Sequence, residues 1–178
     1  MRDAPVITTP RLTLRPHRMD DMDAFWAFYQ TPRADYVGAP KHRTHMFYGL
    51  SSEVVSWDWM GHGAWAIDTN AGDFIGQVAI TQPPHFPERE IGWTLFEAAE
   101  GKGYGMEAAS AALNWAWAQG FETLVSYIHP KNARSVALAT RLGAELDTDA
   151  AIPGGETLDE TIVYRHSPDA DGGPEAYA

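Results

Sequence analysis

The sequence of 178 residues contains no cysteine. This absence excludes disulfides, zinc fingers, iron–sulfur clusters and a catalytic thiol, and with the thiol it excludes an acyl-enzyme formed through cysteine. The chain also lacks any run of about 18 apolar residues, the length that a membrane-spanning helix requires. Residues 1–12 contain no apolar signal core, so we expect a cytoplasmic protein with no membrane partner.

Basic residues are also scarce: 13 Lys and Arg stand against 24 Asp and Glu, which gives a formal net charge of −11. Binding to nucleic acid depends on Lys and Arg side chains that displace counterions from the phosphates, so we expect no nucleic-acid partner. A negative surface attracts cations and therefore favours an amine or a basic peptide as partner. Solubility by itself accounts for most of the charge.

Length and composition predict one folded domain. Hydrophobic residues make up 44% of the chain, which is typical of globular proteins, and 178 residues can bury about two-thirds of the surface of the unfolded chain. We place this domain at residues 1–166. Residues 167–178 are rich in glycine, proline and acids, and they are predicted to form a disordered acidic tail.

Hydrophobic patterns interrupted by glycine and proline predict an α/β (α+β) fold with a mixed, largely antiparallel sheet. The predicted strands are 11–15, 64–69, 74–81, 90–96, 123–128, 145–147 and 161–165. The predicted helices are 21–30, 45–60, 104–119 and 133–142, with side-chain caps expected from Asp20, Thr44 and Asn132. The aromatic residues Phe47, Tyr48, Trp57, Trp59 and Trp65 are assigned to the hydrophobic core, with a substrate pocket as the alternative.

Three glycines, Gly101, Gly103 and Gly105, lie between the predicted strand 90–96 and the alanine-rich helix 104–119. Glycine leaves the backbone N–H groups unobstructed, and the first N–H groups of a helix have no intrahelical partner. The helix dipole favours negative charge at the same place. The loop is therefore predicted to hold a phosphate-bearing ligand.

Two nucleotide-binding motifs fit this loop poorly. A P-loop requires a lysine and then a serine or threonine after its second glycine, but Met106 and Glu107 follow here. A dinucleotide-binding fold requires an acid at the end of the next strand to hold the ribose, but that strand ends in His129 and Pro130.

The loop Glu100–Gly105 resembles the pyrophosphate-binding motif of the GNAT N-acetyltransferases, Q/R-x-x-G-x-G/A. Three other segments resemble motifs of the same family: Glu90–Trp93, Asn132–Ser135 and Arg141–Ala144. The segment Thr9–Arg15 resembles the opening of its RimJ/RimL-like branch, the ribosomal-protein N-terminal acetyltransferases and their relatives. The resemblance extends over residues 7–166, with the motifs in the family's order.

The resemblance implies a three-layer sandwich in which helices flank a twisted, mixed, mostly antiparallel sheet whose central strands, 90–96 and 123–128, splay apart. Acetyl-CoA would lie in the gap between these strands. The implied cofactor-binding residues are Trp93, Thr94, Leu95, Gly101, Lys102, Gly103, Tyr104, Gly105 and Asn132.

The sequence departs from the family pattern at three positions. Glu100 stands where the family usually has glutamine or arginine, and Ala144 replaces a phenylalanine. Ala139 replaces the tyrosine that protonates the departing thiolate in many members.

Metal chemistry is not expected, because His42 and His45 have suitable spacing but lack a third ligand.

The resemblance also implies transfer of an acetyl group from acetyl-CoA to a primary amine, which is a protein N-terminal α-amine or a small-molecule amine. Without cysteine, we expect direct attack of the amine on the thioester. Glu90 is the candidate base, the N–H of Leu95 the candidate oxyanion donor, and Ser135 the candidate acid, with Tyr127 as a weaker alternative. The rival hypothesis is a non-catalytic GNAT-like module that binds CoA or a peptide. The acceptor and the oligomeric state, a homodimer included, stay open.

Overall fold

The computed structural model describes residues 3–168, and the predicted tail lies outside the described residues from residue 169 onward. The described chain forms an α/β fold with one sheet of eight strands in the order β1-β2-β3-β4-β5-β6-β8-β7. The strands are β1 (Ile7–Thr8), β2 (Leu12–Arg15), β3 (Ala64–Thr69), β4 (Phe74–Thr81), β5 (Glu90–Leu95), β6 (Leu124–Ile128), β7 (Glu145–Leu146) and β8 (Ile162–His166). Neighbouring strands are antiparallel except β5 and β6, which are parallel.

Four α-helices and two 3₁₀-helices complete the described part of the chain. They are α1 (Asp21–Tyr29), η1 (Pro32–Tyr36), α2 (Arg43–Met60), η2 (Glu97–Ala99), α3 (Tyr104–Ala118) and α4 (Ala133–Arg141). The order and type of every predicted element are confirmed, and most bounds agree within two residues. The short elements β1, η1 and η2 carry too few residues to show a hydrophobic period, and the sequence did not predict them.

Of the three predicted caps, one is confirmed. The side chain of Asn132 accepts a hydrogen bond from the backbone N–H of Ser135 and so caps α4. Asp20 occupies the N-cap position of α1, as predicted, but it has helical dihedral angles and its side chain makes no capping hydrogen bond. The prediction for Thr44 is wrong, because α2 begins at Arg43, one residue before it.

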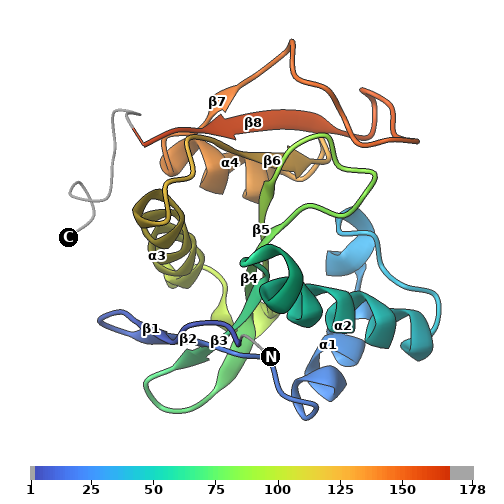
Figure 1. Cartoon of the computed structure of the whole chain (residues 1–178). Coiled ribbons are helices and arrows are strands. Elements are labelled where there is room, and N and C mark those ends of the chain that lie inside the picture. Colours follow the sequence, from blue (N-terminus) through green and yellow to red (C-terminus); the bar gives the residue numbers. More distant parts are fainter. Residues whose placement is uncertain (1–2, 169–178) are drawn as a thin grey trace.

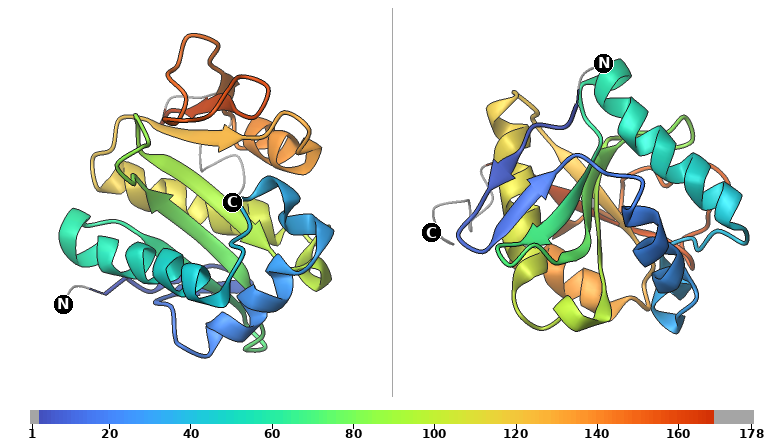
Figure 2. Two further views of the ribbon diagram at one scale, coloured as in Figure 1. Left: turned by 90° about the vertical axis from the view of Figure 1, so that its right-hand side faces the viewer. Right: turned by 90° about the horizontal axis from the view of Figure 1, so that it is seen from below.

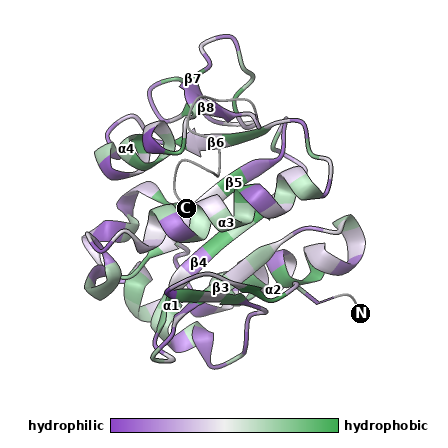
Figure 3. Ribbon diagram, turned by 90° about the vertical axis from the view of Figure 1, so that its left-hand side faces the viewer, coloured by the Kyte–Doolittle hydropathy of each residue, from purple (hydrophilic) through white to green (hydrophobic). Residues whose placement is uncertain are grey.

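The sheet lies between two layers of helices. Helices α3 and α4 cover one face, and α1 and α2 cover the other (Figures 1 and 2). Helix α3 packs closely on the sheet because small residues face it: Ala108, Ala109, Ala112 and Ala116 are at most 1% exposed. The strand β3 beneath them is strongly hydrophobic (Figure 3), with Trp65 and Ile67 fully buried.

The assignment of the aromatic residues to the core is half right. Trp57 and Trp65 are buried, and their rings meet edge to face with centroids 4.6 Å apart. Trp59 is 82% exposed and Tyr48 is 62% exposed, because both lie on the outer face of α2.

No helix in the described part of the chain is long and apolar enough to cross a membrane.

A buried ion network ties β2 and β3 to α1. The guanidinium of Arg15 donates two hydrogen bonds to Asp21, at 2.8 and 2.9 Å, and two to Asp68, at 2.6 and 2.9 Å. Burial by itself raises the pKa of Asp21, but hydrogen bonds from Arg15, His17 and the Arg18 backbone outweigh it and hold that pKa well below its usual range.

The sheet divides between β5 and β6, as the sequence predicted. Only one residue pair joins these strands, Glu90 with Val125, whereas β6 pairs along its whole length with β8. Just past the last pair, the hydroxyl of Ser126 donates a 2.7 Å hydrogen bond to the carbonyl of Ile91 and so bridges the two strands. Beyond this point the strands diverge, and we call the resulting gap the V (Figure 1).

A histidine supports the bridge at the apex of the V. His166 Nε2 lies 3.0 Å from the Ser126 oxygen. Since the single proton of Ser126 goes to Ile91, Nε2 carries the proton that is donated to Ser126. Burial lowers the pKa of His166 to about 4, so its imidazole stays neutral at physiological pH. The apex is thus fixed by a neutral hydrogen-bonded pair.

Candidate active site

The V exposes unpaired backbone along β5. The N–H of Phe96 donates to the carbonyl of Ile75, in β4, at 2.9 Å. Backbone groups of successive residues in a strand point to opposite edges, so the N–H groups of Trp93 and Leu95 point toward β6. Strand β6 offers them no ladder partner there. These groups are free to bind an amide-bearing or carbonyl-bearing ligand that lies in the V.

The glycine loop, residues 101–105, adjoins the open end of β5, and we call this loop the cradle. Gly101 and Gly103 have φ values of +72° and +80°, a region that favours glycine, and Gly103 occupies the N-cap position of α3. A Cβ at Gly105 would lie 2.9 Å from Leu95 Cδ1 and 3.2 Å from Leu138 Cδ2. The loop therefore packs directly against the ends of β5 and α4, and the cradle and the V form one continuous surface.

The N-terminal motif fastens this loop. Thr9 Oγ1 and the backbone N–H of Arg11 both donate to one carboxylate oxygen of Glu107, at 2.6 and 2.9 Å. The Arg11 side chain donates to the other oxygen at 2.6 Å and to the Lys102 carbonyl at 2.8 Å. Its guanidinium also covers the ring of Tyr104. Two sequence motifs that lie nearly 100 residues apart thus meet at the cradle.

The carboxylate of Glu100 forms ion pairs with two arginines. It pairs with the guanidinium of Arg33 in η1 and, at 2.6 Å, with that of Arg134 in α4. Arg33 also pairs with Glu97 at 3.1 Å. Two cations therefore neutralise Glu100, which offsets the repulsion expected between an acid and a neighbouring phosphate.

Glu90 lies in the V, near its apex. One carboxylate oxygen accepts a long hydrogen bond of 3.4 Å from the backbone N–H of Tyr127, in β6. A Cβ placed on Gly92 would have the Glu90 carboxyl group as its nearest neighbour, at 3.6 Å. Burial raises the pKa of Glu90 to about 8, and the negative charges of Glu53 and Glu156 add to the shift. A carboxyl group with such a pKa can exchange a proton near neutral pH.

The other candidate acid–base residues lie at the start of α4 and in β6. Ser135 is half-buried in the first turn of α4, and no hydrogen bond among residues 3–168 joins it to Glu90. The Tyr127 hydroxyl accepts a 3.2 Å hydrogen bond from the backbone N–H of Glu88. Ala139 is fully buried and packs in a cluster with Ala144 and Trp93. Apolar packing therefore replaces the hydroxyl group that a tyrosine would bring to position 139.

The segment between α1 and α2, which we call the strap, crosses the open end of the V. The ring of Tyr36, at the end of η1, lies 4.8 Å from the ring of His129, which follows β6. The ion pairs of Arg33 anchor the same helix to the glycine-loop side. The segment between α1 and α2 thus spans both strands of the V.

The sequence did not predict a small pocket on the opposite face of the sheet from α3. This pocket, about 160 Å³, lies between α1, α2 and β4, and Glu53 and Gln77 are among its lining residues. The available signal was Gln77 itself, a polar residue inside the apolar strand β4. Glu53 gave no signal, because a glutamate on a helix is usually exposed.

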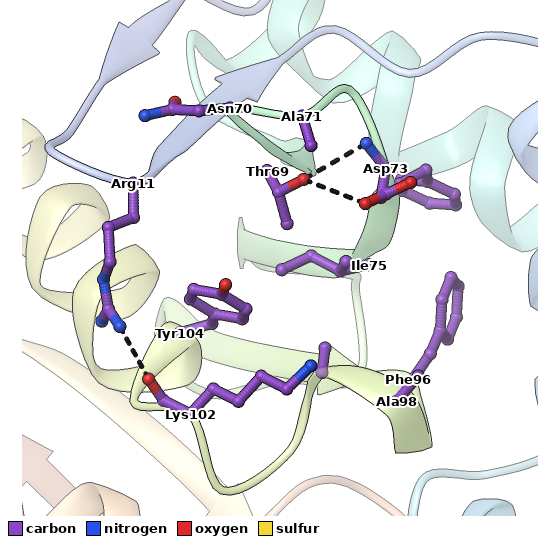
Figure 4. Close-up of a pocket in the computed structure, with 12 residues that line it drawn as sticks. Arg11, Thr69, Asn70, Ala71, Asp73, Ile75, Phe96, Ala98, Lys102 and Tyr104 are labelled. Atoms are coloured by element: carbon purple, nitrogen blue, oxygen red, sulfur yellow. Dashed lines mark hydrogen bonds between the residues drawn. The ribbon is translucent and has the colours of Figure 1, made fainter.

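A larger pocket, about 610 Å³, lies beside the cradle and away from the V (Figure 4). It is lined by the β3–β4 turn, by Phe96 and by the loop residues Lys102 and Tyr104, and it includes no residue of β6 or α4. It therefore shares only the glycine loop with the candidate active site.

The described residues contain no group of three or more His, Cys, Asp or Glu that could hold a metal ion.

The family model of the acetyltransferase (GNAT) domain matches residues 11–145. A crystal structure of an acetyltransferase from Agrobacterium tumefaciens str. C58 is 40% identical, covers 93% of this chain and 96% of its own, and superposes with a TM-score of 0.85. The fold also matches RimL, a ribosomal L7/L12 α-N-protein acetyltransferase in complex with coenzyme A, at 17% identity, 94% and 100% coverage and a TM-score of 0.73. A ribosomal-protein-S5-alanine acetyltransferase from Vibrio fischeri matches at 17% identity, 93% and 98% coverage and a TM-score of 0.68.

The splayed sheet and its glycine loop define an acyltransferase of the acetyl-CoA-dependent class. The chain belongs to the GNAT family of acetyltransferases, and the family predicted from its motifs is confirmed. The predicted fold, with helices on both faces of an open, mostly antiparallel sheet, is confirmed as well.

Proposed function

We propose that this enzyme transfers the acetyl group of acetyl-CoA to a primary amine by direct attack. The observation that carries the proposal is the juxtaposition, in one gap, of unpaired β5 backbone and the perturbed carboxyl group of Glu90. The pantetheine arm would lie along Trp93, Thr94 and Leu95. Its amides would bind the free backbone groups, while Asn132 contributes its side-chain N–H₂, which its capping bond leaves available.

The pyrophosphate would bind at residues 101–105. Gly101 has no heavy atom within 4 Å of the position of an added Cβ, so the loop leaves room there for a phosphate. The N–H groups of Gly103, Tyr104 and Gly105 begin α3, where the helix dipole favours an anion. Lys102 adds a positive charge next to them.

In the proposed reaction, Glu90 takes a proton from the acceptor ammonium, and the neutral amine attacks the thioester carbonyl. The N–H of Leu95 stabilises the oxyanion. The new C–N bond forms as the C–S bond breaks, and the nitrogen loses its second proton to Glu90, which has passed the first one to water and then passes on the second. Ser135 supplies a proton to the leaving thiolate and regains one of these two protons from the water. The buried Ala139 has no proton to supply, so Ser135 is our candidate for this role, with Tyr127 as the weaker alternative.

The pKa of Glu90, about 8, favours an α-amine over a lysine side chain as acceptor. An α-amine has a pKa of about 8, so proton transfer to Glu90 is nearly thermoneutral. A lysine, with a pKa of about 10.4, would cost about 3 kcal/mol for the same transfer. We therefore propose a peptide N-terminus or a small α-amine as acceptor. The RimL and ribosomal-protein acetyltransferases with the same fold support this acceptor class and a RimJ/RimL-like enzyme, which we propose acts in the cytoplasm.

Release of CoA tests the proposed function against the alternative of a non-catalytic module, which the missing tyrosine at position 139 favours. We expect free thiol to appear only when acetyl-CoA is combined with an amine, tested with peptides that begin with serine or alanine and with simple amines. Isothermal titration measures acetyl-CoA binding in parallel. Binding without thiol release for every acceptor would establish the binding module instead.

Gly103→Ala is expected to raise the KM for acetyl-CoA about 10-fold with little change in kcat, because a Cβ at φ +80° strains the cradle by about 1–2 kcal/mol. The added Cβ would also lie 3.2 Å from Arg11 Nη2. Gly120→Ala is the matched control, since Gly120 has φ +84°, open space and a place at the far end of α3. Equal KM values in the two variants would exclude residue 103 from the cofactor site.

A further inference from the structure

The pocket between α1, α2 and β4 has the size of one compact chemical group. Its volume is about 160 Å³, which corresponds to about five water molecules and is less than the ~300 Å³ of the smallest drug-sized sites. Its walls are of mixed polarity, and their apolar side chains include Phe25, Met46 and Leu50. Its acidic and amide groups are Glu53 of α2 and Gln77 of β4.

These two side chains offer hydrogen-bond acceptors. Gln77 Nε2 donates to Glu53 Oε2 at 3.1 Å, which leaves Gln77 Oε1 buried and without a partner. A buried carbonyl without a hydrogen-bond partner is destabilising, so a ligand N–H that reaches it binds favourably. A ligand with N–H donors therefore fits this pocket better than one with acceptors.

The negative charge of Glu53 also lacks a strong counter-charge. No salt bridge within residues 3–168 joins Glu53 to a lysine or arginine. Its titratable neighbours are His17, Tyr29 and Glu90, and His45 lines the same pocket. Burial raises the pKa of Glu53, and a cationic ligand would reverse that shift by stabilising the carboxylate.

The pocket lies at a fixed distance from the candidate base. Gln77 pairs with Thr94 across β4 and β5, so their side chains lie on the same face of the sheet. The Glu90 carboxyl group adjoins Gly92. Gly92 lies two residues before Thr94 in β5, so it is on the same face of the sheet as Thr94. Gln77 and Gly92 are therefore diagonal neighbours on adjacent strands, and such side chains lie about 7–8 Å apart, which we take as the spacing between the reacting amine and the pocket.

We propose that Glu53 and Gln77 select acceptors that carry a second cationic N–H group, an ammonium or a guanidinium, about 7–8 Å from the amine to be acetylated. Glu53 neutralises the cation, and Gln77 Oε1 accepts one of its N–H groups. The inference rests on the proposed function, since it takes the group next to Glu90 to be the reacting amine. It adds a specificity determinant on the sheet face opposite α3.

The test compares a diamine, lysine amide, with norleucine amide, which has the same α-amine but lacks the second nitrogen. The two nitrogens of lysine amide are separated by five carbons and lie about this far apart when the chain is extended. We expect wild-type kcat/KM to favour the diamine by at least about 10-fold, or 1.4 kcal/mol. Glu53→Gln and Gln77→Met should each lower this ratio by about 10-fold through the acceptor KM, with the KM for acetyl-CoA unchanged. Glu145→Gln, an exposed charge change on β7, is the matched control and should keep the wild-type ratio.

Calorimetric binding of the diamine separates the two proposals. Lysine amide should bind more tightly than norleucine amide, and Glu53→Gln should abolish the difference. That result supports the pocket even if no CoA is released, in which case only the transfer reaction fails. Turnover of both amines with equal kcat/KM in wild type, or a ratio unchanged in both pocket variants, overturns the pocket and leaves the acetyltransferase function intact.

Discussion

Glu90→Gln is expected to lower kcat/KM by about 10²–10⁴-fold, the usual contribution of a general base, with little change in acetyl-CoA binding. Glutamine keeps the shape of the side chain but cannot take a proton from the acceptor. Glu90→Asp, which keeps the carboxyl group at a shorter reach, should retain more activity than Glu90→Gln. Steady-state rates of CoA release and calorimetric acetyl-CoA affinities provide the two measurements.

The pH profile distinguishes a base from a structural residue. Wild-type kcat/KM should rise as the pH passes through about 8, because the reaction needs the deprotonated carboxylate. An arylamine acceptor, which is already neutral across this range, removes the acceptor's own titration from the profile. If the rise persists in Glu90→Gln with an arylamine, another group is the base.

The same substitution should stabilise the fold at alkaline pH. Because the folded-state pKa of Glu90 is raised to about 8, the native state binds more protons than the unfolded state between roughly pH 4.5 and 8. Stability is therefore lost as the pH rises through this window. Glu90→Gln removes that loss, so its Tm at pH 8 should equal or exceed the wild-type value. Lower activity with higher stability marks a residue retained for function.

Arg15→Met is expected to destabilise the protein by about 3–5 kcal/mol, because it leaves Asp21 and Asp68 without their counter-ion. Arg15 is 6% exposed and Asp21 is 4% exposed, so water cannot replace the lost hydrogen bonds. For a chain of this length, the loss corresponds to a fall in Tm of roughly 10 °C. Urea and thermal unfolding measure the effect.

Arg43→Met provides the control, since Arg43 also pairs with an aspartate, Asp23, but at the surface. Its expected cost is about 0–1 kcal/mol. Adding Asp68→Asn to Arg15→Met should recover part of the loss, because one of the two unpaired carboxylates is then neutral. A cost for Arg15→Met no larger than that for Arg43→Met would show that the network contributes little.

The V was predictable because the sequence features that indicate it are local. Gly101 and Gly103 mark the cradle by their positive φ values, and the segment Glu90–Leu95 carries both the motif and the strand pattern. The strap and the Glu100 ion pairs were not predictable. Arg33 and Arg134 lie 67 and 34 residues from Glu100, and no periodicity relates positions so far apart.

The sequence by itself determined the order of the helices and strands, the family and the residues that line the V. Hydrophobic period, glycine and proline act within a few residues, so one sequence suffices to read them. Only the tertiary structure decided the environment of each side chain. It brought Glu53 of α2 against Gln77 of β4, buried the Glu90 carboxyl group, and placed Ser126 and His166 at the apex. Desolvation and pairing depend on atoms from distant segments, which no local pattern records.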